Sequence, residues 1–501
     1  MRIIDKFQIM EFQAVIMAAG RGSRMLDLTS KIPKPLLSIA NKPLIWYSVN
    51  YLEKSGFEEV TIVTLESLKE DIFRALVEEN DVQIVLNIIG IKDDNEWGTA
   101  DSLRFIADKI NCDNILVISC DTITFIPLQL LANVHRTKDS SLTVLLTSRP
   151  SQIPDANIGP KSKIKYERDI IGLNDEERLL IYGAEADFED KIILKHSFLI
   201  NYPNFNIYTT LMDCHMYMIK KWIITYIIEN KKISSIKGDL IPKLIQKRPK
   251  ILVSQYSSDN LNKSFSTQSS ALNYITKNLD LTIINDNSDN LGSSYLTPSL
   301  QMGDSINNTL SNSPKQSAIC YDLASKPYLD TFYKNTETQE KSHTLPNFFA
   351  YVYSEIPSSC IRVHTFHEYC LANKLVAKSS QMFFDDQKLQ HKSNLPPDAN
   401  IHISNDSLLE QCTLKENVNI KKSIIGKHCS FENNVKITNS IIGNHVIIRE
   451  NSNINNSVIL NHCELGKNCE IKDSFIGCSQ NLPDKSKMVN EELLDRVFME
   501  I

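Results

Sequence analysis

Short apolar runs alternate with amphipathic stretches from residue 12 to about residue 250. The apolar runs predict five buried β-strands, at Phe12–Met17, Val60–Thr64, Val82–Leu86, Ile115–Ile118 and Leu142–Leu146. The stretches between them include two helix candidates, Leu44–Ser55 and Thr99–Ile110. Strands that alternate with helices usually pair in parallel, with helices on both faces of the sheet. The pattern therefore predicts an α/β domain over 12–252, in which ligands would bind at the carboxyl ends of the strands.

The pattern then stops over residues 253–345, which are rich in Ser, Asn, Asp and Thr. Such a composition buries too little apolar surface to offset the loss of chain entropy on folding. We therefore predict a disordered insert or linker here. A folded core resumes near Phe348, and residues 346–399 are interpreted as a connecting segment.

A repeat of 17 residues dominates the chain from about residue 400 to residue 485. One column of the repeat contains Ile403, Ile420, Ile437, Ile454 and Ile471. Four more columns keep the same step: Leu408, Ile425, Ile442, Ile459 and Ile476; Cys412, Cys429, Val446 and Cys463; Leu414, Phe431, Ile448 and Leu465; and Val418, Val435, Ser452 and Cys469. Stacked coils that point one aliphatic residue per face inward would bury continuous ladders. The repeat predicts a β-helix over 400–485 with a tail over 486–501, and its hexapeptide character resembles the left-handed β-helix.

Histidines and cysteines fall on the same step. His428, His445 and His462 lie 17 residues apart, which predicts a stack at a solvent-facing corner of the coils. A metal-binding or pH-sensing role is the alternative. The coil cysteines are expected to pack inward as small apolar residues, and no set of metal ligands emerges from the sequence.

Bulk properties restrict the class of protein. The 501 residues carry a formal net charge of -6, so no strong basic field attracts nucleic acid. The eleven cysteines include no Cys-x-x-Cys pair, which favours a reducing compartment, the cytosol. No apolar segment is long enough to predict a membrane span or a signal peptide.

Three motifs in the first domain carry a family resemblance. They are Ala18-Ala19-Gly20-Arg21-Gly22-Ser23-Arg24, Ile32-Pro33-Lys34-Pro35-Leu36-Leu37 and Asn41-Lys42-Pro43-Leu44-Ile45. Their order and spacing resemble the signature of nucleoside-diphosphate-sugar pyrophosphorylases, which implies a Rossmann-like, nucleotidyltransferase-type sheet. The resemblance makes Gly20, Gly22, Arg24 and Lys34 candidates for phosphate binding, because glycine backbone N–H groups and cationic side chains suit phosphate oxygens. It also makes Thr99 a candidate for contact with base or sugar, and Asp121 a candidate magnesium ligand.

Other parts of the enzyme signature are missing. The enzymes carry Glu-Lys-Pro for the sugar, where this chain has Phe188-Glu189-Asp190-Lys191-Ile192, and Asn-x-Gly before a strand, where it has Leu211-Met212-Asp213-Cys214. Their Trp-x-Asp-x-Gly segment, which holds the second metal-binding aspartate, has no match. One carboxylate alone holds magnesium poorly during phosphoryl transfer. We therefore predict a residual pocket without catalytic residues, metal or cofactor. In it, Arg24 and Lys34 would form ion pairs or face solvent, and Asp121 would have a capping or turn role.

At a closer level, Phe12–Thr64, Ile207–Lys247 and Ile437–Ile501 resemble the gamma-subunit family of eukaryotic translation initiation factor 2B. This factor exchanges guanine nucleotide on the GTPase that delivers initiator tRNA. The exchange domain is a helical domain at the C-terminus of the epsilon subunit, whereas this chain ends at Ile501, soon after its last coil. The resemblance implies a non-catalytic subunit. Its partners would be the epsilon subunit, other subunits of the factor and the GTPase complex, without direct contact to nucleic acid or membrane.

Two enzyme classes are the alternatives. A sugar-nucleotide pyrophosphorylase can also join such a domain to a β-helix. A β-helix acyltransferase would need a catalytic histidine on a protruding loop, whereas His428, His445 and His462 lie within the coils. Release of pyrophosphate that depends on Lys34 and Asp121 would favour the pyrophosphorylase.

Overall fold

The computed structural model describes residues 11–94, 96–148, 158–160, 168–188, 191–246, 281–284, 295–298, 346–356, 358–383, 392–394, 401–404 and 406–494. The chain divides into two compact units. The first contains Met1–Tyr166, Thr210–Ile236 and Phe349–Ile501, and the second contains Glu167–Thr209 and Lys237–Phe348. Within the predicted polar insert 253–345, the structure describes only strands β14 (Leu281–Ile284) and β15 (Tyr295–Pro298). The rest of that prediction lies outside the described residues.

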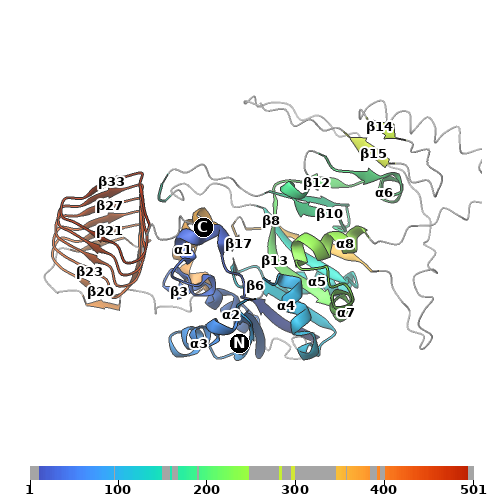
Figure 1. Ribbon diagram of the computed structural model, residues 1–501, viewed down its shortest axis with the longest axis horizontal. Helices are drawn as coiled ribbons and strands as arrows, with labels where there is room; N and C mark the ends of the chain where they lie inside the picture. Colours follow the sequence, from blue (N-terminus) through green and yellow to red (C-terminus); the bar gives the residue numbers. More distant parts are fainter. Residues whose placement is uncertain are drawn as a thin grey trace, which may run out of the picture. The chain divides into compact units, whose positions relative to one another are not determined.

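A seven-stranded mixed sheet forms the core of the first unit (Figure 1), with the strand order β16-β8-β13-β6-β1-β4-β5. Its strands are β1 (Phe12–Met17), β4 (Glu59–Leu65), β5 (Val85–Ile91), β6 (Asn114–Ser119), β8 (Leu142–Ser148), β13 (Leu211–Lys220) and β16 (Phe348–Tyr353). Strands β5, β4, β1 and β6 run parallel, whereas β13 is antiparallel to both β6 and β8. The predicted α/β fold is confirmed, although β5 begins three residues later than the predicted strand Val82–Leu86.

Helices cover this sheet (Figure 1): α2 (Leu44–Lys54), α3 (Lys69–Phe73), α4 (Thr99–Phe105), α5 (Leu128–Thr137) and α7 (Lys221–Glu229). Two further pairs of short strands matter for the site: the hairpin β2 (Ser38–Ile39) with β3 (Lys42–Pro43), and β7 (Thr122–Thr124) with β17 (Cys360–Arg362). Helix α10 (Phe366–Lys378) follows β17, and α11 (Ser380–Phe383) follows α10. A capping box begins α10, since the Thr365 hydroxyl accepts from the Glu368 N–H and the Glu368 carboxylate accepts from the Thr365 N–H. Within the ranges that the structure describes, no helix is long and apolar enough to cross a membrane.

The second unit contains a small antiparallel sheet of β9 (Asp169–Leu173), β10 (Leu179–Ala184) and β12 (Asn206–Tyr208). Helix α8 (Ile241–Gln246) packs against β10. Strand β11 (Leu194–Lys195) pairs with β15, and α6 (His196–Asn201) follows β11.

Stacked parallel coils form the C-terminal part of the chain, the arrangement of a left-handed β-helix (strands β20 to β33 in Figure 1). One face holds β19 (His402–Ile403), β21 (Asn419–Lys421), β24 (Lys436–Thr438), β27 (Asn453–Asn455), β30 (Glu470–Lys472) and β33 (Lys487–Val489). The other faces share one sheet: β18 (Lys392–Asn394), β20 (Leu408–Leu414), β22 (Ile424–Lys427), β23 (Ser430–Phe431), β25 (Ile441–Ile442), β26 (Ile447–Ile448), β28 (Val458–Ile459), β29 (Glu464–Leu465), β31 (Phe475–Ile476), β32 (Asn481–Leu482) and β34 (Glu492–Leu493). Paired residues such as Ile437 and Ile454 are 17 apart, as the repeat predicts.

The interior and the corners of the coils explain the repeat. The predicted inward columns are buried, with Ile437, Ile454 and Phe431 all 0% exposed. Each coil turns at residues with left-handed φ near +50° to +60°, most of them Asn or His, for example Asn434, Asn439 and His445. The same step continues to Met488, which pairs with Ile471. The coils therefore extend beyond the predicted end at residue 485, into the predicted tail 486–501.

One predicted column is wrong at its first member. The sequence step assigns Leu408 to the inward column of Ile425, but Leu408 pairs with Ile424 across an irregularity in β20. Only 16 residues separate this pair, so Leu409 becomes the inward residue and joins the interior cluster with Ile425. Leu408 instead begins an outward apolar column that continues through Ile424, Ile441, Val458 and Phe475.

This outward column joins the β-helix to the sheet domain. It belongs to the same buried cluster as residues of β1, α2 and α10, and the Phe475 ring packs edge-on against Phe366 with a centroid distance of 5.1 Å. The tip of the hairpin β2–β3 is fixed by two polar contacts. The Asn41 side chain donates to the Ile425 carbonyl at 2.9 Å, and the Ala40 N–H donates to the Asn373 side chain at 2.8 Å. The apolar core of the sheet domain therefore extends onto the outer side of the coils, whose interior is a cluster of its own.

Candidate functional site

The glycine loop follows β1 at the carboxyl end of the parallel strands, as predicted. Gly22 has φ +73°, and a Cβ there would lie 3.0 Å from Thr29 and 3.3 Å from Lys34. A side chain at Gly22 would therefore be strained, whereas a Cβ at Gly20 would meet open space. Arg24 lies in the short helical turn Ser23–Met25 and is exposed.

Asp121 is the centre of a buried charge cluster. It follows β6 and is 1% exposed. Lys34, from the helical turn Lys34–Leu36, donates to Oδ2 of Asp121 at 2.5 Å. Arg362, at the end of β17, approaches from 241 residues away, with Nε 3.4 Å from Oδ1 and Nη2 3.5 Å from Oδ2. Both oxygens of the carboxylate therefore bind cationic side chains of the same chain.

The charges of this cluster favour the ionised carboxylate. Burial alone would raise the pKa of Asp121, but the positive charges of Arg362 and Lys34 together hold that pKa well below its ordinary value. The prediction that Lys34 forms an ion pair is thus matched by the geometry. Arg362 was missed by sequence reasoning, because no local motif links it to Asp121.

Thr99 and the start of α4 do not join the Asp121 cluster by any hydrogen bond among the described residues. The Thr99 hydroxyl accepts from the Ile236 N–H at 2.9 Å. The Ser234 carbonyl accepts from the N–H groups of Ala100 and Asp101, at 2.7 and 3.3 Å. A Cβ on Gly98 would lie 2.3 Å from that same carbonyl oxygen, so glycine permits the close approach. These N–H groups are satisfied within the chain.

The segment that replaces Asn-x-Gly lies in β13, next to β6. The Asp213 carboxylate is 1% exposed and accepts from the Tyr217 hydroxyl at 2.5 Å and from the His215 N–H at 2.9 Å. His215 has φ +51°, a conformation that glycine adopts more easily. The pairing of β13 with β8 shifts between Asp213 and Tyr217, which marks a bulge at this point. Asp213 is thus a second buried acid that sequence reasoning left without a role.

The residues around Asp121 do not fit a bound magnesium ion. Mg²⁺ needs carboxylate oxygens that are open to it, whereas Lys34 and Arg362 contact both oxygens of Asp121. Across the described ranges, no group of three or more His, Cys, Asp or Glu side chains could hold a metal ion. No reaction step through a metal is therefore derived for this site.

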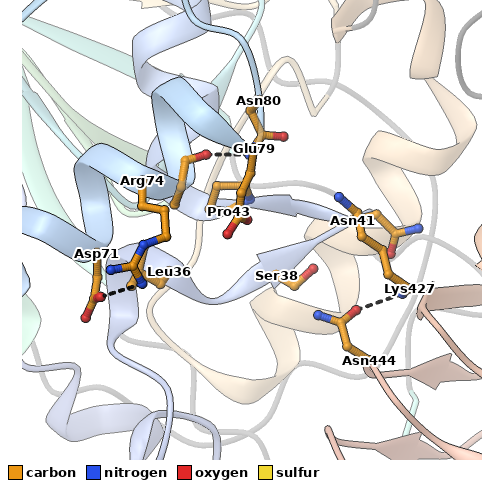
Figure 2. Close-up of a pocket in the computed structure, with 11 residues that line it drawn as sticks. Leu36, Ser38, Asn41, Pro43, Asp71, Arg74, Glu79, Asn80, Lys427 and Asn444 are labelled. Atoms are coloured by element: carbon orange, nitrogen blue, oxygen red, sulfur yellow. Dashed lines mark hydrogen bonds and ion pairs between the residues drawn. The ribbon is translucent and has the colours of Figure 1, made fainter.

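Figure 2 shows a separate pocket of about 250 Å³ between the hairpin β2–β3, the helical segment around α3, and the coils. Hairpin side chains such as Ser38 and Asn41 face Lys427 and Asn444 of the coils across it. Among its polar groups, the Asn444 side chain accepts from the Lys427 N–H at 2.8 Å. The pocket contains none of the six predicted pocket residues and is part of the joint between hairpin and coils.

The predicted histidine stack is present at one corner of the coils. His428 and His445 have ring centroids 5.1 Å apart, and His445 and His462 have centroids 4.9 Å apart. Burial and the neighbouring His462 and His428 lower the pKa of His445. The left-handed φ at all three residues agrees with the corner position. The coil cysteines pack inward as expected, and burial raises the pKa of the Cys463 thiol to about 11.

Two models of known protein families match parts of the chain. Residues 13–156 match the family model described as nucleotidyl transferase, and residues 397–470 match the one described as GMPPB C-terminal domain. The confirmed fold class thus rests on the geometry and on these matches together.

Curated relatives agree with the closer resemblance. The chain is 32% identical over 255 residues to the gamma subunit of translation initiation factor eIF2B from Dictyostelium discoideum, which covers 47% of this chain and 57% of that protein. It is 31% identical over 241 residues to the gamma subunit from Schizosaccharomyces pombe, covering 47% and 51%. A mannose-1-phosphate guanyltransferase from Debaryomyces hansenii is 25% identical over 137 residues, covering 27% and 37%. The match thus spans about half the length of the gamma subunits, and the predicted resemblance to them is confirmed.

Proposed function

Because this chain is similar to gamma subunits of eIF2B, we propose that it is a supporting subunit of the guanine-nucleotide exchange factor of translation initiation. In this proposal it works in the cytosol, pairs with the epsilon subunit and other subunits, and helps them engage the initiation GTPase. Exchange itself belongs to the epsilon subunit. The chain supplies docking surface and positions its partner.

The state of Asp121 is the observation that carries the non-catalytic part of this proposal. A nucleotidyltransferase needs a carboxylate that is free to hold a metal ion against the charge of phosphoryl transfer. Here Lys34 and Arg362 contact both oxygens of Asp121. Gly20, Gly22, Arg24, Lys34, Thr99 and Asp121 are proposed to be the remnant of a nucleotide pocket. The contacts of Lys34, Thr99 and Asp121 within the chain favour a structural role for these three.

The coils support the docking part of the proposal. Among the described residues, the strand pairing of the face of β21 to β33 ends at β33, so this strand has a neighbour on one side only. Flat exposed strands of this kind suit association with a chain of similar architecture. The epsilon subunit is the partner that the resemblance implies.

Purification of the tagged full-length chain from cells tests this proposal. We expect the other subunits of the exchange factor to copurify in fixed proportion, identified by their masses. A matched control carries Phe431→Ala, which removes a side chain that is 0% exposed inside the coils. This variant weakens the β-helix and should therefore retain fewer partners than the wild type. A chain that purifies alone would contradict the proposal.

A sugar-nucleotide pyrophosphorylase is the alternative, and the similarity to mannose-1-phosphate guanyltransferase is the observation that favours it. The same purified chain is incubated with magnesium, a nucleoside triphosphate and a sugar phosphate. We expect no release of pyrophosphate. Release that disappears in both Lys34→Ala and Asp121→Asn variants would establish the enzyme instead.

A further inference from the structure

The residue that faces Asp121 from β17 has the opposite charge to the one that the enzyme signature requires. The signature places its second metal-binding aspartate in Trp-x-Asp-x-Gly. In this chain the segment Cys360-Ile361-Arg362-Val363-His364 places its central residue, an arginine, against Asp121. Sequence reasoning found no match, because none of the three defining residues is present. Only the structure brings this segment to Asp121.

The backbone fixes Arg362 in that position. Arg362 pairs with Thr122 in the short sheet of β17 and β7, directly after Asp121. The Val363 N–H donates to the Asp121 carbonyl at 2.9 Å. A side chain at position 362 therefore starts beside Asp121, as a second ligand of one shared metal ion would have to. The Arg362 side chain is only 12% exposed and ends at the carboxylate.

One arginine can supply the same net charge beside Asp121 as a metal ion with a second aspartate. A divalent cation together with a second aspartate contributes a net charge of about +1 beside the first aspartate. One guanidinium contributes the same charge, and its N–H groups can donate to both carboxylate oxygens. The guanidinium lies 3.4 Å from Oδ1 and 3.5 Å from Oδ2 of Asp121, the distances of an ion pair with long hydrogen bonds to both oxygens. Lys34 belongs to the retained part of the enzyme signature and adds its own contact.

We propose that Arg362 stands at the position of the second metal-binding carboxylate and replaces the metal ion as the cation that neutralises Asp121. The ancestral metal site is thereby converted into an internal ion pair. This pair holds the chain segment that returns through β17 and α10 against the carboxyl end of β6. The inference goes beyond the proposed function, because it concerns the first unit whatever assembly the chain joins.

The Arg362→Asp variant of the full-length chain tests this proposal by titration with Mn²⁺, which takes the same oxygen ligands as magnesium. Electron paramagnetic resonance of the free ion gives the bound fraction. We expect Arg362→Asp to bind one Mn²⁺ about tenfold or more tightly than the wild type. The gain should disappear in the double variant Asp121→Asn with Arg362→Asp. Lys34 stays unchanged in all of these proteins.

Circular dichroism of each variant controls for folding. If Arg362→Asp does not fold, Arg362→Asn removes the positive charge without adding a negative one, and it should still bind Mn²⁺ more tightly than the wild type. Two results would overturn the proposal: wild-type chain that binds Mn²⁺ as tightly as the variants through Asp121, or folded variants that bind none. Copurification with partners is measured separately, so a failure here leaves the proposed assembly unaffected.

Discussion

Replacing Phe431 by alanine will lower the free energy of unfolding of the β-helix by about 3–5 kcal/mol, the usual cost of removing a buried phenylalanine. The ring of Phe431 is 0% exposed and lies in the interior cluster of the coils, between the coils of Leu414 and Ile448. Each coil buries its inner face only against its neighbours. A cavity at Phe431 therefore weakens the coil on either side as well.

Denaturant unfolding followed by circular dichroism measures this loss. Lys436→Ala is the matched control, because Lys436 is exposed on the outer side of β24, only five residues along the chain. The control should change the free energy of unfolding by less than about 0.5 kcal/mol. Equal effects of the two substitutions would mean that the columns do not form the core of this part of the chain.

Replacing Asp121 by asparagine will destabilise the sheet domain by about 3–5 kcal/mol, since removal of one partner leaves buried charge without compensation. The Asp121 side chain is 2% exposed, and those of Lys34 and Arg362 are each 12% exposed. Asparagine keeps the shape of the side chain but not its charge. Asp108→Asn is the control, because Asp108 is exposed in the helical turn Ala107–Lys109. A loss of stability no larger than that of the control would contradict a stabilising role for the buried charge cluster around Asp121.

We also expect Asp121→Asn to change how the stability of the protein depends on pH. Arg362 and Lys34 outweigh burial and hold the pKa of Asp121 below its ordinary value, which is about 3.9 in the unfolded chain. The stability contributed by the ionised carboxylate is thus fully present above about pH 4 and is lost as pH falls toward the folded-state pKa. In thermal unfolding at a series of pH values, the wild type should lose this contribution below about pH 4. The profile of Asp121→Asn should be flatter there, and parallel profiles would contradict the assignment.

The β-helix could be predicted from the sequence because its interior repeats at a constant step. A step of 17 residues brings Ile437 beside Ile454 whatever the rest of the chain does. The error at Leu408 arose where one coil is a residue shorter, so the step alone assigned Leu408 to the wrong side. The outward column through Ile424 and Phe475 cannot be predicted from the sequence. An apolar residue next to an inward one does not show that another part of the chain packs against the outer side of the coils.

The candidate site was predictable only in part. The resemblance to the pyrophosphorylase signature groups Gly22, Lys34 and Asp121, and Lys34 and Asp121 do meet in the structure. Arg362 reaches the same carboxylate from 241 residues away along the chain. The intervening segment carries no periodic pattern that would relate the two. The motif around Thr99 predicts a place in the pocket, but the Thr99 hydroxyl accepts a hydrogen bond from the Ile236 N–H.

The rate of nucleotide exchange on the initiation GTPase tests the central claim most directly, namely that this chain supports exchange without performing it. The rate is measured with the epsilon subunit alone, with this chain alone, and with the two together. We predict no acceleration by this chain alone, and faster exchange with the pair than with the epsilon subunit by itself. Two results would contradict the claim: exchange catalysed by this chain alone, or an exchange rate with the pair that is no higher than the rate with the epsilon subunit alone.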